Sequence, residues 1–253
     1  MTAATIHARE PARGAVPTVV SWSGGKDSAL ALHALLMDPT VDVRGLLTTI
    51  TDAYDRVSMH GVRAELVAQQ ASAVGLELFT ARIPPHCTNE RYEAVTVAAL
   101  AGLRETGIRC VAFGDLFLAD VRAYRERVVS AAGLEPVFPL WGRPTARLAR
   151  EFVAAGFRAV LACVDPRQLD VSRCGIEFDD ALLDALPRSV DPCGEHGEFH
   201  TFVYDGPMFE RSIAPRPGEL VERDGFVFRD LLPGDATGAT SGDVPRGGMS
   251  HAS

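Results

Sequence analysis

The sequence predicts an α/β fold, in which a parallel sheet with helices on both faces is followed by a smaller C-terminal α/β domain. Short β-branched or apolar runs alternate with helical stretches over residues 17–139, and this alternation is typical of a parallel sheet. The chain has 253 residues, of which 47% are hydrophobic and 23% charged. That length and composition are enough to bury the cores of two ordinary domains.

Five strands and four helices are expected in the first domain, residues 17–139. The first strand is a β-branched run at 18–21, and a glycine-rich turn separates it from a helix at 27–37. Asn89 is the expected N-cap of the helix at 89–106, because its side chain can accept from a first-turn N–H. The other strands are expected at 43–50, 76–83, 109–113 and 136–138, and the other helices at 62–74 and 119–132.

The second domain is expected over residues 140–233, after a crossover at Leu140-Trp141-Gly142-Arg143-Pro144. It contains predicted helices at 145–155 and 178–186, and predicted strands at 159–164, 199–204 and 225–231. The flanking segments 1–16 and 234–253 have no apolar periodicity. They are therefore expected to be disordered tails.

Charge and composition exclude several classes of function. The formal net charge of −8 provides no overall positive field, so nucleic acid is an unfavourable partner. The sequence shows neither a secretory signal nor about 20 consecutive apolar residues, which predicts a cytoplasmic protein without a membrane partner. Five scattered cysteines without a C-x-x-C pair argue against a disulfide framework and against a zinc knuckle.

The turn after the first strand has the features of a phosphate-binding loop, with the string Ser23-Gly24-Gly25-Lys26-Asp27-Ser28. Glycines let the backbone approach an anion, and the N-terminus of the following helix favours negative charge. Lys26 adds a positive charge, and the hydroxyls of Ser23 and Ser28 can donate to phosphate oxygens. Asp27 either holds magnesium or caps the helix. An incidental Gly-Gly-Lys turn is the alternative for the whole loop.

The string SGGKDS is similar to the pyrophosphatase loop of the adenine nucleotide alpha hydrolase superfamily, the PP-loop ATP pyrophosphatases with a domain of HUP type. This resemblance implies a five-stranded parallel sheet that binds ATP. It also implies cleavage between the α and β phosphates, with AMP and pyrophosphate as products. It places adenine and ribose beside Thr48 and Thr49, at the end of the second strand.

Further strings resemble one branch of that superfamily. These are His60-Gly61-Val62-Arg63 followed by Gln69-Gln70-Ala71 and Gly75-Leu76, Gly114-Asp115 followed by Arg122, Arg125 and Glu126 on the next helix, Pro139-Leu140-Trp141, and the loop 191–201, DPCGEHGEFHT. Together they are similar to the diphthine-ammonia ligase family over about residues 18–233, in a compact form of bacterial type. The resemblance implies that a substrate carboxylate is adenylated and that ammonia then displaces AMP to give an amide. Diphthine is a modified histidine on an elongation factor of eukaryotes and archaea, so the acceptor of a bacterial-type member is left open.

The loop 191–201 presents two carboxylates, Glu195 and Glu198. Neighbouring carboxylates can chelate a cation, capture ammonium or act as a general base, whereas the alternative is a turn with two solvated acids. Gly114-Asp115 follows a strand, at the edge where open parallel sheets bind ligands. Asp115 helps to hold magnesium or orients the acceptor, and the alternative is a helix cap. Cys193 is a single thiol, which argues against sulfur transfer.

The sequence thus predicts an ATP-dependent, carbon-nitrogen bond-forming ligase in which Lys26, Asp27, Glu195 and Glu198 are catalytic. The expected partners are ATP, ammonia and a carboxylate acceptor, and the oligomeric state, for which a homodimer is one option, is left open. Two alternatives are a tRNA-modifying ATP pyrophosphatase of the PP-loop type and a non-catalytic nucleotide sensor. Mg²⁺ is assigned to Asp27 and Asp115, and ATP to Ser21, Ser23, Gly24, Gly25, Lys26, Asp27, Ser28, Thr48, Thr49, His60, Gly114 and Asp115.

Overall fold

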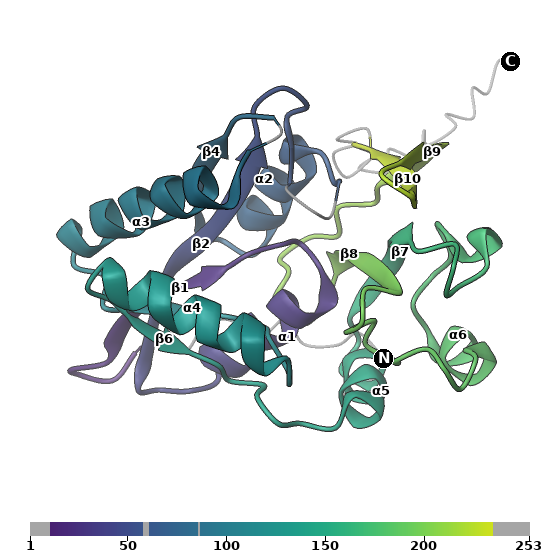
Figure 1. Cartoon of the computed structure of the whole chain (residues 1–253). Helices are drawn as coiled ribbons and strands as arrows, with labels where there is room; N and C mark the ends of the chain where they lie inside the picture. Colours follow the sequence, from purple (N-terminus) through teal and green to yellow (C-terminus); the bar gives the residue numbers. More distant parts are fainter. Residues whose placement is uncertain (1–10, 58–60, 86, 235–253) are drawn as a thin grey trace, which may run out of the picture.

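The computed structural model describes residues 11–57, 61–85 and 87–234, which form two sheets with helices packed around them (Figure 1). The first sheet has five parallel strands, as predicted, and their order is β4-β2-β1-β5-β6. The two-residue strand β3 pairs antiparallel with the end of β2. The strands are β1 (Val16–Ser21), β2 (Val41–Thr51), β3 (Arg56–Val57), β4 (Glu77–Ile83), β5 (Cys110–Ala112) and β6 (Glu135–Val137).

Helices cover both faces of this sheet, because successive strand residues point to opposite sides. Val19 packs in the cluster that contains α3 and α4, whereas Val20 packs in the cluster that contains α1 and α2. Figure 1 shows α3 and α4 side by side over one face. The helices are α1 (Lys26–Leu36), α2 (Ala64–Ala73), α3 (Asn89–Glu105) and α4 (Ala119–Ala131).

The N-cap of α3 is Thr88 and not Asn89 as expected. The Thr88 side chain accepts from the backbone N–H of Arg91 at 3.3 Å, and Asn89 is the first helical residue. The cap is the last residue with extended backbone angles, and that residue is Thr88. The prediction was wrong by one position, within the usual uncertainty of a helix boundary.

The strand order reverses between β1 and β5, which lie next to each other in the middle of the sheet. Strands after β1 extend the sheet on one side, through β2 to β4, and strands after β5 extend it on the other, to β6. The two loops that leave these strands therefore diverge and open a crevice at their carboxyl ends, where open α/β sheets bind ligands. The loop after β1 is the glycine-rich string at 23–28, and the loop after β5 begins with Gly114.

The second sheet is antiparallel, with the strand order β8-β7-β10-β9. β9 was not predicted. Six of its eight residues are exposed at the edge of the sheet and none is buried, and it contains a proline and a glycine, so its sequence lacks apolar alternation. The elements of this region are α5 (Thr145–Ala154), β7 (Arg158–Val164), a 3-10 turn η1 (Val171–Arg173), α6 (Asp180–Ala185), β8 (Phe199–Asp205), β9 (Arg216–Arg223) and β10 (Phe226–Leu232).

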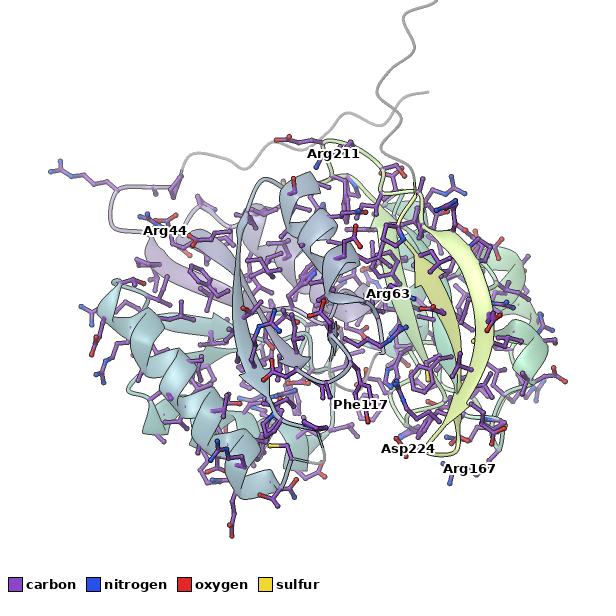
Figure 2. All side chains as sticks on the ribbon, turned by 90° about the horizontal axis from the view of Figure 1, so that it is seen from above. Arg44, Arg63, Phe117, Arg167, Arg211 and Asp224 are labelled. Atoms are coloured by element: carbon purple, nitrogen blue, oxygen red, sulfur yellow. The ribbon has the colours of Figure 1, made fainter. Side chains whose placement is uncertain are left out.

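The two regions share one hydrophobic core, since the larger cluster of buried side chains includes residues of α1, α2, α5, β7 and β8. Charged contacts join them as well: Asp230 on β10 accepts from Arg56 at 2.9 Å and from Arg63 at 2.6 Å. Figure 2 shows Arg63 and Phe117 between the first sheet and the second. The division between residues 139 and 140 stays a prediction.

Part of the predicted N-terminal tail, residues 11–16, is described by the structure and is hydrogen-bonded to the turn before β2. β1 begins at Val16, whose backbone N–H donates to Thr40, and the N–H of Ala12 donates to Pro39. Residues 1–10 and 235–253 lie outside the described residues. Within the described ranges, no helix is both long and apolar enough to cross a bilayer.

Candidate functional site

A cavity of about 250 Å³ lies at the carboxyl ends of β1 and β5, where the two regions of the chain meet. It brings together residues that are far apart in the sequence. The glycine-rich loop after β1 forms one wall, the loop after β5 a second, and the loop before β8 a third. Its lining includes Ser21, Ser23, Gly25, Lys26, Asp27, Ser28, Gly114, Asp115, Arg125, Cys193, Gly194, Glu195, His200 and Thr201.

The glycine-rich loop is folded tightly against the start of α1. Gly25 is the N-cap residue, and no side chain caps the helix. Gly24 has φ of +81°, which only glycine adopts readily, and its carbonyl accepts from the N–H of Val203 on β8 at 2.9 Å. The Ser28 hydroxyl donates to the Gly25 carbonyl at 2.9 Å. The loop is therefore fixed by contacts within itself and with the second sheet, as an anion site at a helix N-terminus requires.

Lys26 links the two halves of the site. Its side chain is 3% exposed, and Nζ donates to both carboxylate oxygens of Asp27, at 2.9 and 2.8 Å, and to the carbonyl of Cys193. Burial by itself favours the neutral amine, but the charges of Asp27 and Glu195 overcome it and raise the pKa of Lys26. Its backbone N–H donates to the Thr201 hydroxyl at 3.0 Å. The side-chain ammonium group of Lys26 is thus held between the glycine-rich loop and the loop before β8.

Gln70 on α2 joins the glycine-rich loop to β8 through side-chain hydrogen bonds. It was not among the site residues predicted from the sequence. Its side chain is fully buried. Oε1 accepts from the indole N–H of Trp22 at 2.9 Å, and Nε2 donates to the carbonyls of Gly24 at 2.9 Å and Val203 at 2.6 Å. The sequence signal was an amide side chain on the apolar face of a predicted helix. Such a side chain is buried only when it is hydrogen-bonded.

We expect Gln70→Met to loosen the glycine-rich loop. It removes three hydrogen bonds to buried groups and leaves the Trp22 indole N–H without its partner, at a cost of about 1–3 kcal/mol. ATP affinity should fall by about tenfold or more, which corresponds to 1.4 kcal/mol or more. Isothermal titration and thermal unfolding measure the two effects. Gln69→Met, one position away and partly exposed, is the matched control and should change neither. Equal ATP affinity in the two variants would contradict this role for Gln70.

The structure separates the two predicted catalytic glutamates. Glu195 lines the cavity, whereas Glu198 is fully buried beneath the loop and is not part of the lining. The Glu198 carboxylate accepts from the backbone N–H of Asp191 at 2.8 Å and of His196 at 2.9 Å. Both oxygens are therefore used to fold the loop. Because Glu198 does not face the cavity, its geometry does not fit the predicted contact with ammonia or acceptor.

Burial and neighbouring charge bring the pKa of Glu195 close to neutrality. Burial, followed by the negative charge of Asp27, raises the pKa of Glu195 to about 7. On the same wall, burial lowers the pKa of His200 to about 4, so its imidazole is neutral at physiological pH. His200 was not among the predicted site residues. A carboxyl with a pKa near 7 is suited to accept and release a proton at neutral pH.

Asp27 and Asp115 both line the cavity, as the magnesium prediction requires. Burial raises the pKa of Asp115, and one of its oxygens, Oδ2, is buried without a hydrogen-bond partner. Among residues 11–57, 61–85 and 87–234, no cluster of three or more His, Cys, Asp or Glu side chains is arranged to hold a metal ion. Two carboxylates are still enough for Mg²⁺, which keeps several of its waters and takes other ligands from substrate phosphates.

A larger cavity of about 790 Å³ adjoins the first and shares Ser21, Ser23 and Arg125 with it. Thr48 and Thr49 line this cavity, and Oγ1 of the buried Thr48 has no hydrogen-bond partner among the described residues. The cavity opens between α3 and α4, whose Tyr92 and Tyr124 also line it. His60, assigned to the nucleotide in the sequence analysis, lies outside the described residues.

The Cys193 thiol supplies no nucleophile to the smaller cavity. All five are free thiols. Cys193 lines the smaller cavity, but burial raises its pKa to about 12, so the thiol stays protonated at neutral pH. This agrees with the argument against sulfur transfer.

Comparisons with known proteins match both halves of the site. The N-terminal domain model of diphthamide synthase matches residues 16–136, and the C-terminal domain model of the same family matches residues 144–222. The chain belongs to the diphthine-ammonia ligase family. The two matched domains contribute the glycine-rich loop and the loop before β8 respectively, so the smaller cavity of this diphthine-ammonia ligase family member lies where they meet.

Curated members of the diphthine-ammonia ligase family resemble the chain at modest identity. A mouse protein named diphthine-ammonia ligase is 25% identical over 183 residues, which are 70% of this chain and 68% of the mouse protein. A zebrafish protein of the same name is 24% identical over 235 residues, 81% of this chain and 89% of the relative. A Schizosaccharomyces pombe protein of that name is 29% identical over 119 residues, which are 46% of this chain and 20% of the yeast protein.

Proposed function

We propose that the protein is an ATP-dependent, amide-forming ligase. The acceptor carboxylate attacks the α-phosphorus of ATP, and pyrophosphate leaves. Ammonia then attacks the acyl carbon of the adenylate, and AMP leaves with the electron pair of the broken C–O bond. One observation carries the proposal: a single cavity of about 250 Å³ is lined by the glycine-rich loop at the start of α1 and by Glu195. Phosphate binding and proton transfer from ammonium can therefore take place side by side.

The glycine-rich loop is the phosphate-binding element in this proposal. Gly24 and Gly25 allow the backbone to approach the anion, and the Ser23 hydroxyl donates to its oxygens. The Ser28 hydroxyl would donate there as well once it turns away from the Gly25 carbonyl. Lys26 neutralises charge that develops on the phosphates, since its ammonium is desolvated and held in position by Asp27. Asp27 and Asp115 would hold Mg²⁺, which when bound would stabilise negative charge on the phosphate oxygens.

Glu195 is the proton acceptor for ammonium in this proposal. The attacking species must be neutral ammonia, so one proton of ammonium has to move to a base at the site. The Glu195 carboxylate takes that proton, because its pKa of about 7 lies close to neutrality. Glu198 instead keeps the loop folded through its two backbone contacts. This role replaces the catalytic one expected from the sequence.

Incubation with α-labelled ATP, Mg²⁺ and ammonium tests the proposal, with separation of AMP from ADP. Diphthine, which the names of the relatives specify, is the first acceptor to supply, on an elongation factor that carries it. A small-molecule extract supplies other carboxylates. AMP formation that needs an acceptor and ammonium is the expected result. Tight ATP binding without AMP would favour a nucleotide sensor, and AMP formation with tRNA alone would favour a tRNA-modifying enzyme. The cytoplasmic location and the homodimer stay predictions.

The pH dependence of Glu195→Gln provides a further prediction. For wild-type protein at a fixed concentration of ammonium, amide formation should rise as pH passes through about 7, because the carboxylate form of Glu195 then accumulates. The variant should lose most activity and show no such rise. The free energy of unfolding gives an independent readout. The folded-state pKa lies above the ordinary value of 4.5, so wild-type stability falls as pH rises from about 4.5 to 7.

Glu195→Gln should therefore gain melting temperature relative to wild type at pH 8 and much less at pH 5. Glu198→Gln serves as the comparison, since it exchanges one accepting oxygen for a donor that faces a backbone N–H. That variant should be destabilised by about 1–3 kcal/mol. A wild-type activity profile retained in Glu195→Gln would refute the assignment of the base.

A further inference from the structure

Arg125 on α4 stands at the junction of the two cavities. The smaller and the larger cavity share three lining residues, Ser21, Ser23 and Arg125. Of these three, only Arg125 carries a charge. The guanidinium packs over the ring of Phe113 at 5.0 Å, at the end of β5. Arg125 and the first residues of α1 line the same smaller cavity.

The contacts of Arg125 differ from those of the other arginines on α4. Arg127 forms a two-pronged ion pair with Glu93, including an Nη2–Oε2 contact of 3.0 Å. Arg122 donates to Glu126 at 2.7 Å and lies between two aromatic rings. Arg125 has only an ion pair of 3.5 Å with Asp115, from Nε to Oδ2, and both of these buried atoms lack a hydrogen-bond partner. Arg125 thus has donor capacity that the described residues do not use.

Lys26 cannot take the same role. Its ammonium already donates to both oxygens of Asp27 and to the Cys193 carbonyl. An acceptor carboxylate that attacks ATP must approach another anion, so it needs a neighbouring positive charge. A guanidinium fits a carboxylate with two parallel hydrogen bonds, whereas an ammonium cannot.

We propose that Arg125 binds the carboxyl group of the acceptor and orients it toward the α-phosphate at the junction of the two cavities. This inference rests on the proposed function and adds to it the residue that recognises the acceptor. The carboxylate takes up the unused guanidinium donors, and the loose pair with Asp115 is the contact that gives way. Arg125 is thus a binding residue for the acyl half of the adenylate, and the nucleotide half is held by other residues.

Two unreactive probes separate these halves. The first is 5′-sulfamoyladenosine, which mimics the nucleotide half, and the second is 5′-O-(N-acetylsulfamoyl)adenosine, in which an acetyl group stands for the acceptor. Isothermal titration of the full chain measures both. Arg125→Lys keeps the positive charge beside Asp115, and Arg125→Met removes it. Arg122→Lys is the matched control on the same helix, since Arg122 lines neither cavity.

Wild-type protein should bind the acetylated probe more tightly than the other one. Arg125→Lys should weaken the acetylated probe about tenfold while it leaves the unacylated probe within about twofold, as expected for lost charge-assisted hydrogen bonds. Arg122→Lys should change neither. Equal weakening of both probes, or none, in Arg125→Lys would overturn the role of Arg125 and leave the proposed function intact. Failure of wild type to bind either probe would overturn the proposed function and this inference with it.

Discussion

Lys26→Met is expected to reduce AMP formation by about 10²–10³-fold, the effect of removing one preorganised charge-stabilising donor from an active site. The ammonium is 3% exposed and bound to Asp27 and to the Cys193 carbonyl, so water cannot replace it. Methionine keeps the length of the side chain and removes only the charge and the donors. The assay with α-labelled ATP, Mg²⁺, ammonium and acceptor measures the loss.

A second readout tests the Lys26 ion pair in the wild-type protein, and thermal unfolding of Lys26→Met shows whether the variant is folded. Lys26 is the only lysine in the chain, so protein labelled with [13Cε]lysine gives a single lysine resonance. We expect that resonance to titrate above the ordinary lysine pKa of 10.5, because the surrounding carboxylates outweigh the effect of burial. Addition of ATP should shift it. Titration at or below 10.5 would contradict the described ion pair, and normal AMP formation by a folded Lys26→Met would contradict its catalytic role.

Gly114→Ala is expected to abolish nucleotide binding. A Cβ at this position would lie 2.6 Å from the backbone carbon of Asp27, 2.7 Å from its carbonyl oxygen and 2.9 Å from the nitrogen of Ser28. The first turn of α1 would have to move away from β5, and overpacking of this kind costs about 1–3 kcal/mol. The displaced turn carries the backbone N–H groups that we propose bind phosphate, so the free energy of ATP binding should fall by more than the free energy of unfolding.

Gly102→Ala is the matched control for this prediction. Gly102 lies within α3, and a Cβ there would have no neighbour within 4 Å. Alanine in a helix interior should raise stability by up to about 1 kcal/mol and leave ATP affinity unchanged. Equilibrium binding of ATP and denaturant unfolding of both variants make the comparison. An ATP affinity in Gly114→Ala equal to that of Gly102→Ala would show that the close approach of β5 to α1 does not shape the site.

The sequence by itself determined the parallel sheet and the position of the glycine-rich loop. Both depend on local patterns: apolar runs such as the one before Ser21 alternate with helical stretches, and Gly24 and Gly25 follow a strand and precede a helix. Lys26, Asp27 and Ser28 directly follow these glycines in the chain. Prediction of the loop therefore also predicted the position of these three residues. β9 escaped prediction because a solvent-exposed edge strand needs no apolar alternation.

The tertiary structure decided which of the predicted residues meet. Glu195 and Glu198 look equivalent in the sequence, yet the fold of one loop turns the first into the cavity and buries the second under backbone N–H groups. Gln70 contacts Gly24 and Val203, 46 and 133 positions away, and no local pattern encodes such contacts. Burial and neighbouring charge, which set the pKa of Glu195, likewise arise only when the chain is folded.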